Sequence, residues 1–572
     1  MLSNLFRRKK IDDILHNIED QNFGKNVLNK KLGVFDLTML GVAGIIGAGI
    51  FSVIGNAAYT GGPAIVVLFA FIAVTCGFSA LCYAQFASII PVSGSAYTYS
   101  YVVFGELIAW IIGWDLIIEY AVGNIAIAIS WSDYFTHFVN YFGVNVPAYL
   151  STDYLTAFRG FTTVSEQIKS GISINEVSPA LQEAFSAYKN APVVFGMRLI
   201  ADIPAFSIVI LITYIAFIGI NESRIANNIL VILKLAILML VILFGSMYID
   251  TENWQPFAPN GIEGVLKGTA GVFFAYIGFD AISTTAEESR NPQKDLPRSI
   301  IYSIIITTIM YIAIGLVITG MVSYKLLGVG DPLAFVFSYV GAGNISFIIS
   351  LSAIIAMASV LLVFQIGQPR IWMSMSRDGL LPEKFSRIHK KHRTPAFATI
   401  VTGILVAVPT LFLNLTEVTD LTSIGTLFAF ALVSGGVLFL NKEIYGSTKP
   451  TFRIPYINSR KYLPLLWISI ILIILFSVNN NFFENIISGN FKDSFLMNSE
   501  NIVFISIAAI FTFFAIYKEF SLIPGIALLS NLYLMCQLGL TNWIRFGIWL
   551  LIGLIIYFLY GYRKSKLREK QV

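Results

Sequence analysis

Apolar residues occur along this chain in long runs that shorter polar segments separate. A membrane-spanning helix needs about 20 predominantly apolar residues, and the sequence holds about fourteen runs of that kind. The pattern therefore predicts an all-α polytopic membrane protein. The runs are Phe35–Tyr59, Pro63–Ile90, Glu106–Phe135, Leu199–Ile220, Ala226–Ile249, Gly264–Glu287, Ile300–Val322, Ile345–Met373, Ala396–Leu413, Thr422–Leu440, Tyr462–Val478, Ile502–Lys518, Leu522–Leu538 and Trp543–Tyr562.

Composition supports this interpretation, and the placement of charge adds an orientation. Hydrophobic residues make up 56% of the chain and charged residues 12%, against about 25% charged residues in soluble proteins. Lys and Arg gather in short segments that would all lie on one side of the membrane, and such segments are typically cytoplasmic. We therefore expect a cell-membrane protein with both termini in the cytoplasm. The basic segments are 7–31, 290–298, 377–393, 442–461 and 563–570.

The runs divide the chain into four parts. We expect a cytoplasmic N-terminal segment at 1–33, a ten-helix core at 34–440, additional spanning helices at 441–562 and a cytoplasmic tail at 563–572. The stretch 141–196 is too polar to span a membrane, and short helices that cap the outer face are expected there. The three cysteines lie in apolar runs and suggest no disulfide framework. No cofactor and no metal is expected.

The first run contains an unusual cluster of glycines. Its central part, Gly41–Phe51, includes the sequence Gly47-Ala48-Gly49. Unpaired backbone groups are costly in lipid, so non-helical backbone at this depth is tolerated only where protein buries it or where it lines a cavity. The cluster therefore predicts a broken helix around a binding site. A dinucleotide-binding loop is excluded, because no strand precedes the glycines and the third glycine is missing.

The sixth run has the same character. Gly278 lies mid-span and Asp280 adds an acid inside a spanning segment. Two glycine-interrupted runs at corresponding positions of two five-helix halves point to a transporter substrate site. Free N–H groups of a half-helix suit a carboxylate, and carbonyls of the other break suit an ammonium, so a zwitterionic amino acid fits both. The alternative is that the glycines only allow close helix packing.

Several motifs resemble those of the amino acid–polyamine–organocation (APC) transporter superfamily. Gly-Ala-Gly-Ile-Phe at 47–51 resembles its helix 1 signature, and Phe274–Asp280 resembles its helix 6. Further stretches are similar to those of the cationic amino acid transporter subfamily, and together the motifs cover most of residues 30–440 and resume near 524–562. These stretches are Pro91–Tyr97, Trp114–Tyr120, Glu287–Pro297, Gly367–Arg370 and Ser376–Pro382.

The resemblance implies the LeuT fold, a 5+5 inverted repeat with broken helices 1 and 6, which works by alternating access. It places the substrate carboxylate on helix 1, the amino group on helix 6, an outer gate at Phe274 and a side-chain pocket near Met357. The implied substrate-binding residues are Ile46, Gly47, Ala48, Gly49, Ile50, Phe274, Ala275, Ile277, Gly278 and Met357.

Lys234 interrupts the apolar run Ala226–Ile249. An unpaired lysine at the bilayer centre costs about 2.5–3.5 kcal/mol on insertion scales, so it is expected to face the bundle. In relatives a helix 5 lysine takes the place of a sodium ion. We therefore expect Lys234 to couple transport to protons without sodium; a permanently charged strut against helix 1 is the alternative.

Two acids also lie within spanning runs. Glu119 resembles a glutamate typical of the subfamily and either selects a cationic side chain or ties helix 3 to its neighbours; the structural role is favoured. Asp280 follows the helix 6 break and is expected to cap the inner half-helix. Because Met357 and Phe274 are apolar, small or medium neutral L-amino acids are the expected substrates, with lysine, arginine or ornithine as the alternative.

The expected partners are an L-amino acid, protons and the lipid bilayer, with no nucleic acid. A channel is disfavoured because the runs hold few charges and no filter-like repeat. A membrane enzyme is disfavoured because paired catalytic groups are missing at spanning depth. An amino acid sensor with a transporter fold remains an alternative, because fold does not guarantee flux.

Overall fold

A computed structural model describes residues 5–9, 11, 32–90, 95–174, 177–219, 224–286, 289–392, 394–440, 451–465, 467–468 and 499–569. Helices dominate these residues, as predicted. One two-stranded hairpin departs from the all-α expectation: β1 (Val193–Val194) pairs antiparallel with β2 (Met197–Arg198). The predicted eleventh run, Tyr462–Val478, lies largely outside the described residues, as do 12–31, 441–450 and the motif residues 91–94 and 287–288.

Seven helical stretches in the described part of the chain are long and apolar enough to cross a membrane, and five apolar helices are shorter. Glycines and π-helical turns divide several of these stretches. The main helices are α4 (Ile65–Ile89), α6 (Glu106–Ile117), α7 (Gly123–Asn140), α10 (Ile203–Ile218), α11 (Arg224–Gly245), α15 (Pro292–Met321), α17 (Gly343–Arg377), α18 (Ala396–Thr410), α19 (Leu415–Phe439), α24 (Ser499–Lys518), α25 (Leu522–Cys536) and α26 (Leu540–Ile556).

The first and sixth predicted runs are both interrupted, as expected from their glycines. The first consists of α2 (Val34–Ile45), a break, the π-helical turn η2 (Gly49–Val53) and α3 (Ile54–Gly61). The sixth consists of α12 (Gly261–Lys267), α13 (Thr269–Phe274), a break and α14 (Ala281–Thr284). α2 packs against α11, α15 and α17, while α13 packs against α4 and α19.

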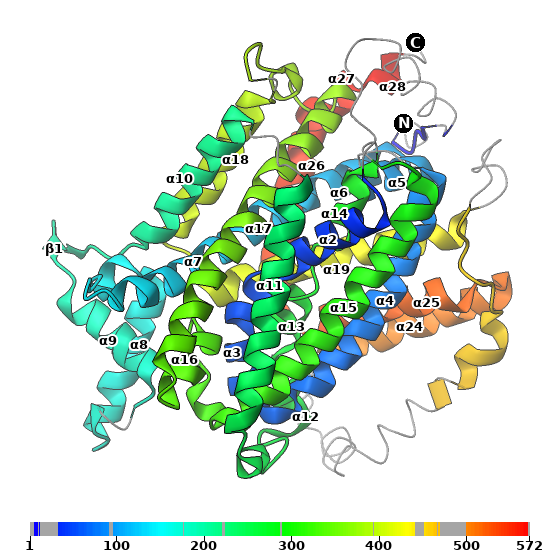
Figure 1. Ribbon diagram of the computed structural model, residues 1–572. Coiled ribbons are helices and arrows are strands. Elements are labelled where there is room, and N and C mark those ends of the chain that lie inside the picture. The colour runs from blue at the N-terminus through cyan, green and yellow to red at the C-terminus, as the bar shows by residue number, and fades with distance from the viewer. Residues whose placement is uncertain are drawn as a thin grey trace.

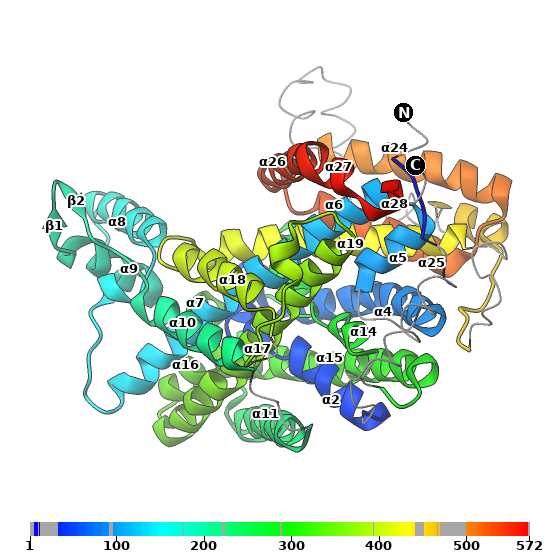
Figure 2. The same ribbon diagram turned by 90° about the horizontal axis from the view of Figure 1, so that it is seen from above.

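Shorter helices cover the two ends of the bundle. Both chain termini lie at one end, together with α5 (Ser95–Val103), α27 (Tyr562–Lys564) and α28 (Lys566–Glu569); we call this the terminal face (Figure 1). The opposite end, the hairpin face, carries α8 (Tyr154–Lys169), α9 (Pro179–Asn190) and α16 (Pro332–Tyr339). The polar stretch 141–196, which was expected to form short helices, contains α8, α9 and the first strand and turn of the β-hairpin. Figure 2 shows that these elements project from one side of the bundle.

The C-terminal helices pack onto one flank of the bundle. α25 lies against α19 and α4, while α26 lies against α19 and α6. Stacked tryptophans fasten α26: the rings of Trp114 and Trp549 lie 4.8 Å apart, and Trp110 and Trp114 each donate a hydrogen bond to an α26 carbonyl. α19 also contacts α13. α25 and α26 therefore support α19, which in turn packs on the second interrupted helix.

Candidate functional site

The break in the first helix exposes a row of backbone donors. Ile46 is extended (φ −77°, ψ 90°), so the α-helical ladder stops there. Among the described residues, the N–H groups of 47–50 have no backbone acceptor, and the ladder resumes with Phe51 N–H donating to the Gly47 carbonyl at 3.3 Å. The start of a helix leaves such donors free by geometry, and it attracts negative charge.

Two buried tyrosines fix the backbone on either side of this break. Tyr311 on α15 donates to the Ile45 carbonyl at 2.9 Å, and Tyr134 on α7 donates to the Phe51 carbonyl at 2.6 Å. Both hydroxyls therefore bind backbone carbonyls that flank the break. The N–H groups between them keep a defined direction.

The break in the sixth run leaves the complementary groups. The chain runs through turns from Ala275 to Asp280, and Gly278 has φ +109°, a conformation that favours glycine. Among the described residues, the carbonyls of 275, 276 and 277 receive no backbone hydrogen bond. These free acceptors suit an ammonium group.

Glycines let the two breaks touch each other. A Cβ built on Gly49 would lie 2.3 Å from the Cα of Ala275, and one built on Gly278 would lie 2.7 Å from the Gly44 carbonyl oxygen. At Gly47 the nearest atom is a methyl of Val360 at 3.5 Å, an ordinary contact distance. Close packing is therefore needed at 44, 49 and 278, whereas Gly47 has room for a side chain.

The predicted aromatic gate and side-chain pocket lie beside these breaks. Phe274 ends α13 and is buried. Met357 is fully buried on α17, one turn before Val360, the residue that faces Gly47. Ala275 and Ile277 are buried within the second break. The predicted substrate-binding residues thus come from the two interrupted helices and from α17, which meet around Gly47.

The acids in the spanning segments lie together rather than apart. Glu119 is buried in a π-helical turn (Ile118–Val122), and the next residue in this turn, Tyr120, reaches Asp280. Tyr120 donates to Asp280 at 3.3 Å. Asp280 occupies the N-cap position of α14 but makes no capping hydrogen bond there. The expectation that it caps the half-helix was wrong, because its carboxyl accepts from Tyr120 in the π-helical turn between α6 and α7 instead.

Lys234 lies on the inward face of α11. It is 2% exposed and belongs to a buried stripe with Val231, Leu238 and Val241, a helical spacing. α11 packs against α2, α15 and α17. The buried side chain of Lys234 therefore faces the bundle, as expected, and its helix packs against α2, the first half of the first interrupted run.

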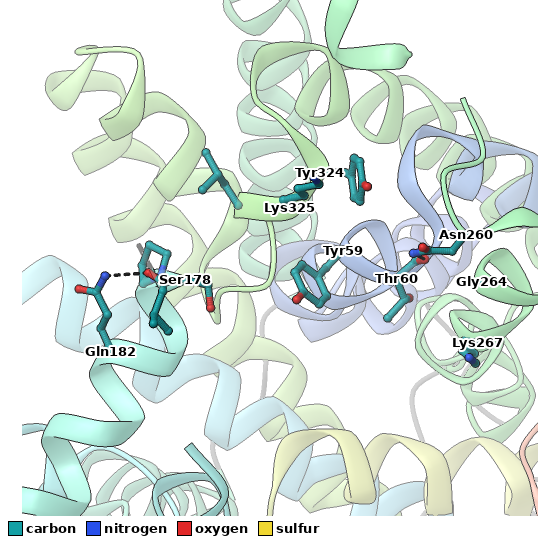
Figure 3. A pocket seen from close by; sticks show the side chains of 12 residues that line it. Tyr59, Thr60, Ser178, Gln182, Asn260, Gly264, Lys267, Tyr324 and Lys325 are labelled. Carbon is teal, nitrogen blue, oxygen red and sulfur yellow. Dashed lines mark hydrogen bonds between the residues drawn. The ribbon is translucent and has the colours of Figure 1, made fainter. Parts of the chain in front are cut away.

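An open cavity lies between the hairpin face and the two interrupted helices. It has a volume of about 910 Å³ and is lined by the ends of α3, α9, α12 and the segment Tyr324–Leu326 (Figure 3). Lys267 and Lys325 supply positive charge on its wall, with amides at Gln182 and Asn260. Both α3 and α12 lead from this cavity toward the breaks.

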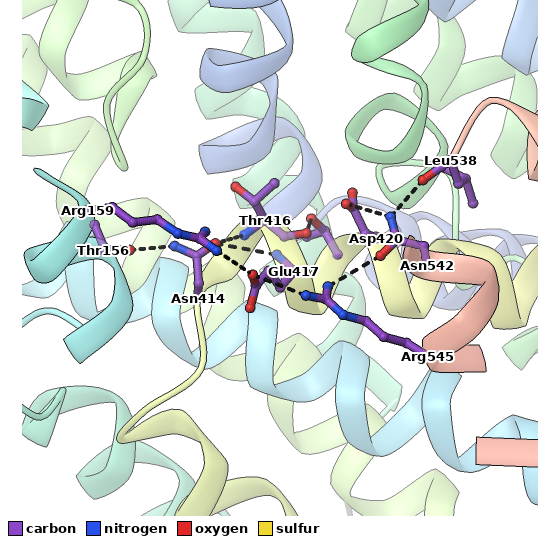
Figure 4. A network of polar contacts seen from close by, with 10 residues as sticks. Thr156, Arg159, Asn414, Thr416, Glu417, Asp420, Leu538, Asn542 and Arg545 are labelled. Carbon is purple, nitrogen blue, oxygen red and sulfur yellow. Dashed lines mark hydrogen bonds and ion pairs between the residues drawn. The ribbon is translucent and has the colours of Figure 1, made fainter. Parts of the chain in front are cut away.

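A polar network on the hairpin face joins three parts of the chain (Figure 4). Glu417 at the start of α19 accepts from Arg159 of α8 at 3.1 Å and from Arg545 of α26 at 3.3 Å. Asn542 donates to Asp420 at 3.0 Å. Because Ser423 on the same helix donates to the Ala270 carbonyl of α13 at 2.8 Å, α19 connects this network to the second interrupted helix.

A second polar cluster, around Asp378, lies at the terminal face and was not predicted from the sequence. Asp378 accepts from Lys9 at 2.6 Å and from Tyr97 at 2.6 Å, and its carbonyl accepts from Lys566 N–H at 3.1 Å. Both ends of the chain thus meet the end of α17. Asp378 belongs to the motif Ser376–Pro382, but no pattern in the sequence links that motif to Lys9, which lies 369 residues away.

Most of the chain matches a known protein family. The amino acid permease family model matches residues 32–505, and a second model, for the C-terminus of these permeases, matches residues 521–565. The chain belongs to the amino acid permease family. The resemblance to APC transporters is thereby confirmed, and so is the expectation that the chain is not an enzyme, because the relatives are named as permeases and transporters.

Three relatives differ in the substrates that their names state. A Bacillus subtilis "Branched-chain amino acid permease BcaP" is 36% identical over 570 residues, covering all of both chains. A "Methylthioribose transporter" of the same species is 39% identical over 80% of this chain and 89% of its own. The Arabidopsis thaliana "Cationic amino acid transporter 4, vacuolar" is 34% identical over 77% of this chain and 67% of its own.

Proposed function

We propose that this permease moves small or medium neutral L-amino acids across the cell membrane by alternating access in a LeuT fold, driven by protons and independent of sodium. Both termini face the cytoplasm, and the cavity beside α3 and α12 is the outer entrance. The alternative substrate class is cationic amino acids.

The observation that carries this proposal is the pair of facing breaks. Donors at 47–50 lack backbone acceptors, and acceptors at 275–277 lack backbone donors. An α-amino acid presents a carboxylate and an ammonium on one carbon, so it satisfies both sets at once. Charge-assisted hydrogen bonds of this kind are stronger than neutral ones. In this scheme Ile46–Ile50 hold the carboxylate, and Phe274–Gly278 hold the amino group.

Burial and chemistry around the breaks favour a neutral side chain. Met357, Phe274 and Val360 are apolar and buried. A cationic specialist needs a carboxylate at the side-chain end of its site, and these three residues offer none. The full-length similarity to a branched-chain amino acid permease supports the same class.

The buried titratable groups support proton coupling. Glu119 and Asp280 are both fully buried, and Tyr120, next to Glu119, donates to Asp280; in this proposal the two carboxyl groups exchange the coupled proton. Asp280 follows directly on the second break, so movement of that half-helix changes its surroundings. Lys234, on a helix beside α2, is the second proton-exchanging group in this proposal.

Uptake into proteoliposomes tests the function. Radiolabelled leucine and alanine should accumulate when the outside is acidic, without sodium, and excess lysine should compete weakly. Stronger competition by lysine than by leucine would favour the cationic alternative. Amino acid binding, detected as a raised melting temperature, without any accumulation or exchange would instead identify a sensor and refute the transport proposal.

A further inference from the structure

The β-hairpin on the hairpin face carries a residue that its own turn disfavours. Val194 pairs with Met197, so Phe195 and Gly196 form a two-residue turn, with φ values of +50° and +81°. Turns with two positive φ values prefer Asn-Gly or Asp-Gly, and positive φ is strained for a bulky residue. Phe195 therefore pays a conformational penalty.

Among the described residues, no burial of the tip offsets this strain. Phe195 is 98% exposed, Val193 is 60% exposed and Leu199 is 54% exposed. No residue from Ala191 to Met197 carries a charge. An apolar tip that breaks a local rule without any gain in packing indicates a function outside the fold.

The stem beneath this tip is firmly held. The guanidinium of Arg198 donates to the carbonyls of Tyr188 at 2.7 Å and Lys189 at 3.2 Å, and it lies over the Tyr188 ring at 4.7 Å from the centroid. Leu199 N–H donates to the Pro192 carbonyl at 2.9 Å. These contacts join the hairpin to the end of α9, so the direction of the tip is set by the fold.

The tip projects from the side of the molecule, next to α10 (Figure 1). In Figure 1 the hairpin projects sideways near the lower end of α10, while the lower ends of α11 and α16 extend further down the view; Figure 2 also places the hairpin at the edge. Asp202 and Ile203 begin α10 soon after β2. The outward face of that helix is apolar, with Ile203, Ile210, Leu211 and Tyr214 exposed.

We propose that the Phe195 tip inserts into the bilayer interface on the hairpin side and anchors the α8–α9 unit to lipid. The apolar surface of the tip continues the lipid-facing surface of α10, and aromatic side chains are enriched at the membrane–water interface. Residues 191–197 themselves offer no charged group for a salt bridge to a partner. A second copy of the chain is the competing occupant, which the experiment below distinguishes.

Site-directed spin labelling tests this anchor. The native cysteines Cys76, Cys82 and Cys536 are buried, so a nitroxide reagent should label an introduced cysteine selectively. The protein is reconstituted into phosphatidylethanolamine–phosphatidylglycerol vesicles with Phe195→Cys, and with Ser170→Cys at the exposed end of α8 as the matched control. The label at 195 should be accessible to oxygen and severalfold less accessible than the label at 170 to a water-soluble nickel complex.

Equal access of the nickel complex to both labels would overturn the proposal. Protection of position 195 from both oxygen and the nickel complex would also overturn it, because such protection indicates that protein covers the tip.

A second design does not depend on labelling the tip. Phe195→Asn supplies the preferred turn residue, so the hairpin should remain folded. A label at Val193→Cys should lose its protection from nickel in this background; unchanged protection there would also refute the anchor.

Discussion

Gly49 and Ala275 touch where the two interrupted helices cross, and a Cβ on Gly49 would lie 2.3 Å from the Ala275 Cα. The clash is with backbone, which cannot rotate away as a flexible side chain can. The two breaks hold each other in position through this contact, together with that between Gly44 and Gly278. The glycine cluster thus has two different uses: close packing at 44 and 49, and open space at 47.

Replacing these glycines should separate the two uses. Gly49→Ala should destabilise the fold by several kcal/mol, at the upper end of the overpacking range of about 1–3 kcal/mol or beyond it, and abolish transport. Gly47→Ala should fold with a nearly unchanged melting temperature but bind substrate more weakly, because its methyl enters the space near Val360. Melting temperature in detergent and the KM for leucine uptake measure the two effects. Equal loss of stability in both variants would contradict this distinction.

Lys234 should be required for coupling rather than for the fold of the site. Lys234→Met keeps the length of the side chain and removes its charge, which should abolish the acceleration of uptake by an inward proton gradient. Counterflow exchange of labelled leucine, which needs no gradient, should continue. Gradient-driven accumulation at the wild-type level in this variant would exclude Lys234 as a coupling group.

The sequence anticipated the local breaks better than the contacts between them. A glycine cluster favours a break in a helix, and the unpaired backbone groups of a break are tolerated in a spanning run only where protein buries them or where they line a cavity. The interruptions around Gly47 and Gly278 could therefore be predicted from composition and position alone. Which atoms meet is a matter of tertiary packing. Nothing in the one-dimensional pattern showed that Asp280 would accept from Tyr120 instead of capping α14, or that Lys9 would reach Asp378. Phe195 was invisible for a similar reason, since a turn with two positive φ values is set by strand register.

Asp202 should stabilise the start of α10. It caps this helix, accepting from the Ser132 hydroxyl at 2.6 Å and from Ala205 N–H at 3.0 Å. Removing a side-chain cap costs about 0.5–2 kcal/mol.

Asp202→Ala should lower the melting temperature, whereas Asp202→Asn keeps a side-chain oxygen at the cap and should lower it less. Melting curves of the wild type and both variants in one detergent measure the difference. Equal losses in the two variants would show that the side-chain oxygen does not stabilise the helix start.

Glu417 should stabilise the hairpin face through charge. Its Oε1 receives both Arg159 and Arg545, whose side chains are 59% and 39% exposed, so solvent screens each pair to about 0.2–1 kcal/mol. Glu417→Gln should lower the melting temperature by a few degrees at low salt, and the difference should shrink in about 1 M salt, where the Debye length is about 3 Å. Glu383→Gln, which weakens an exposed pair with Arg387 on the terminal face, is the control and should have almost no effect. If the loss at Glu417 were independent of salt, the carboxylate would act by packing and hydrogen-bond geometry. α19 would then be tied to α8 and α26 by shape rather than by charge.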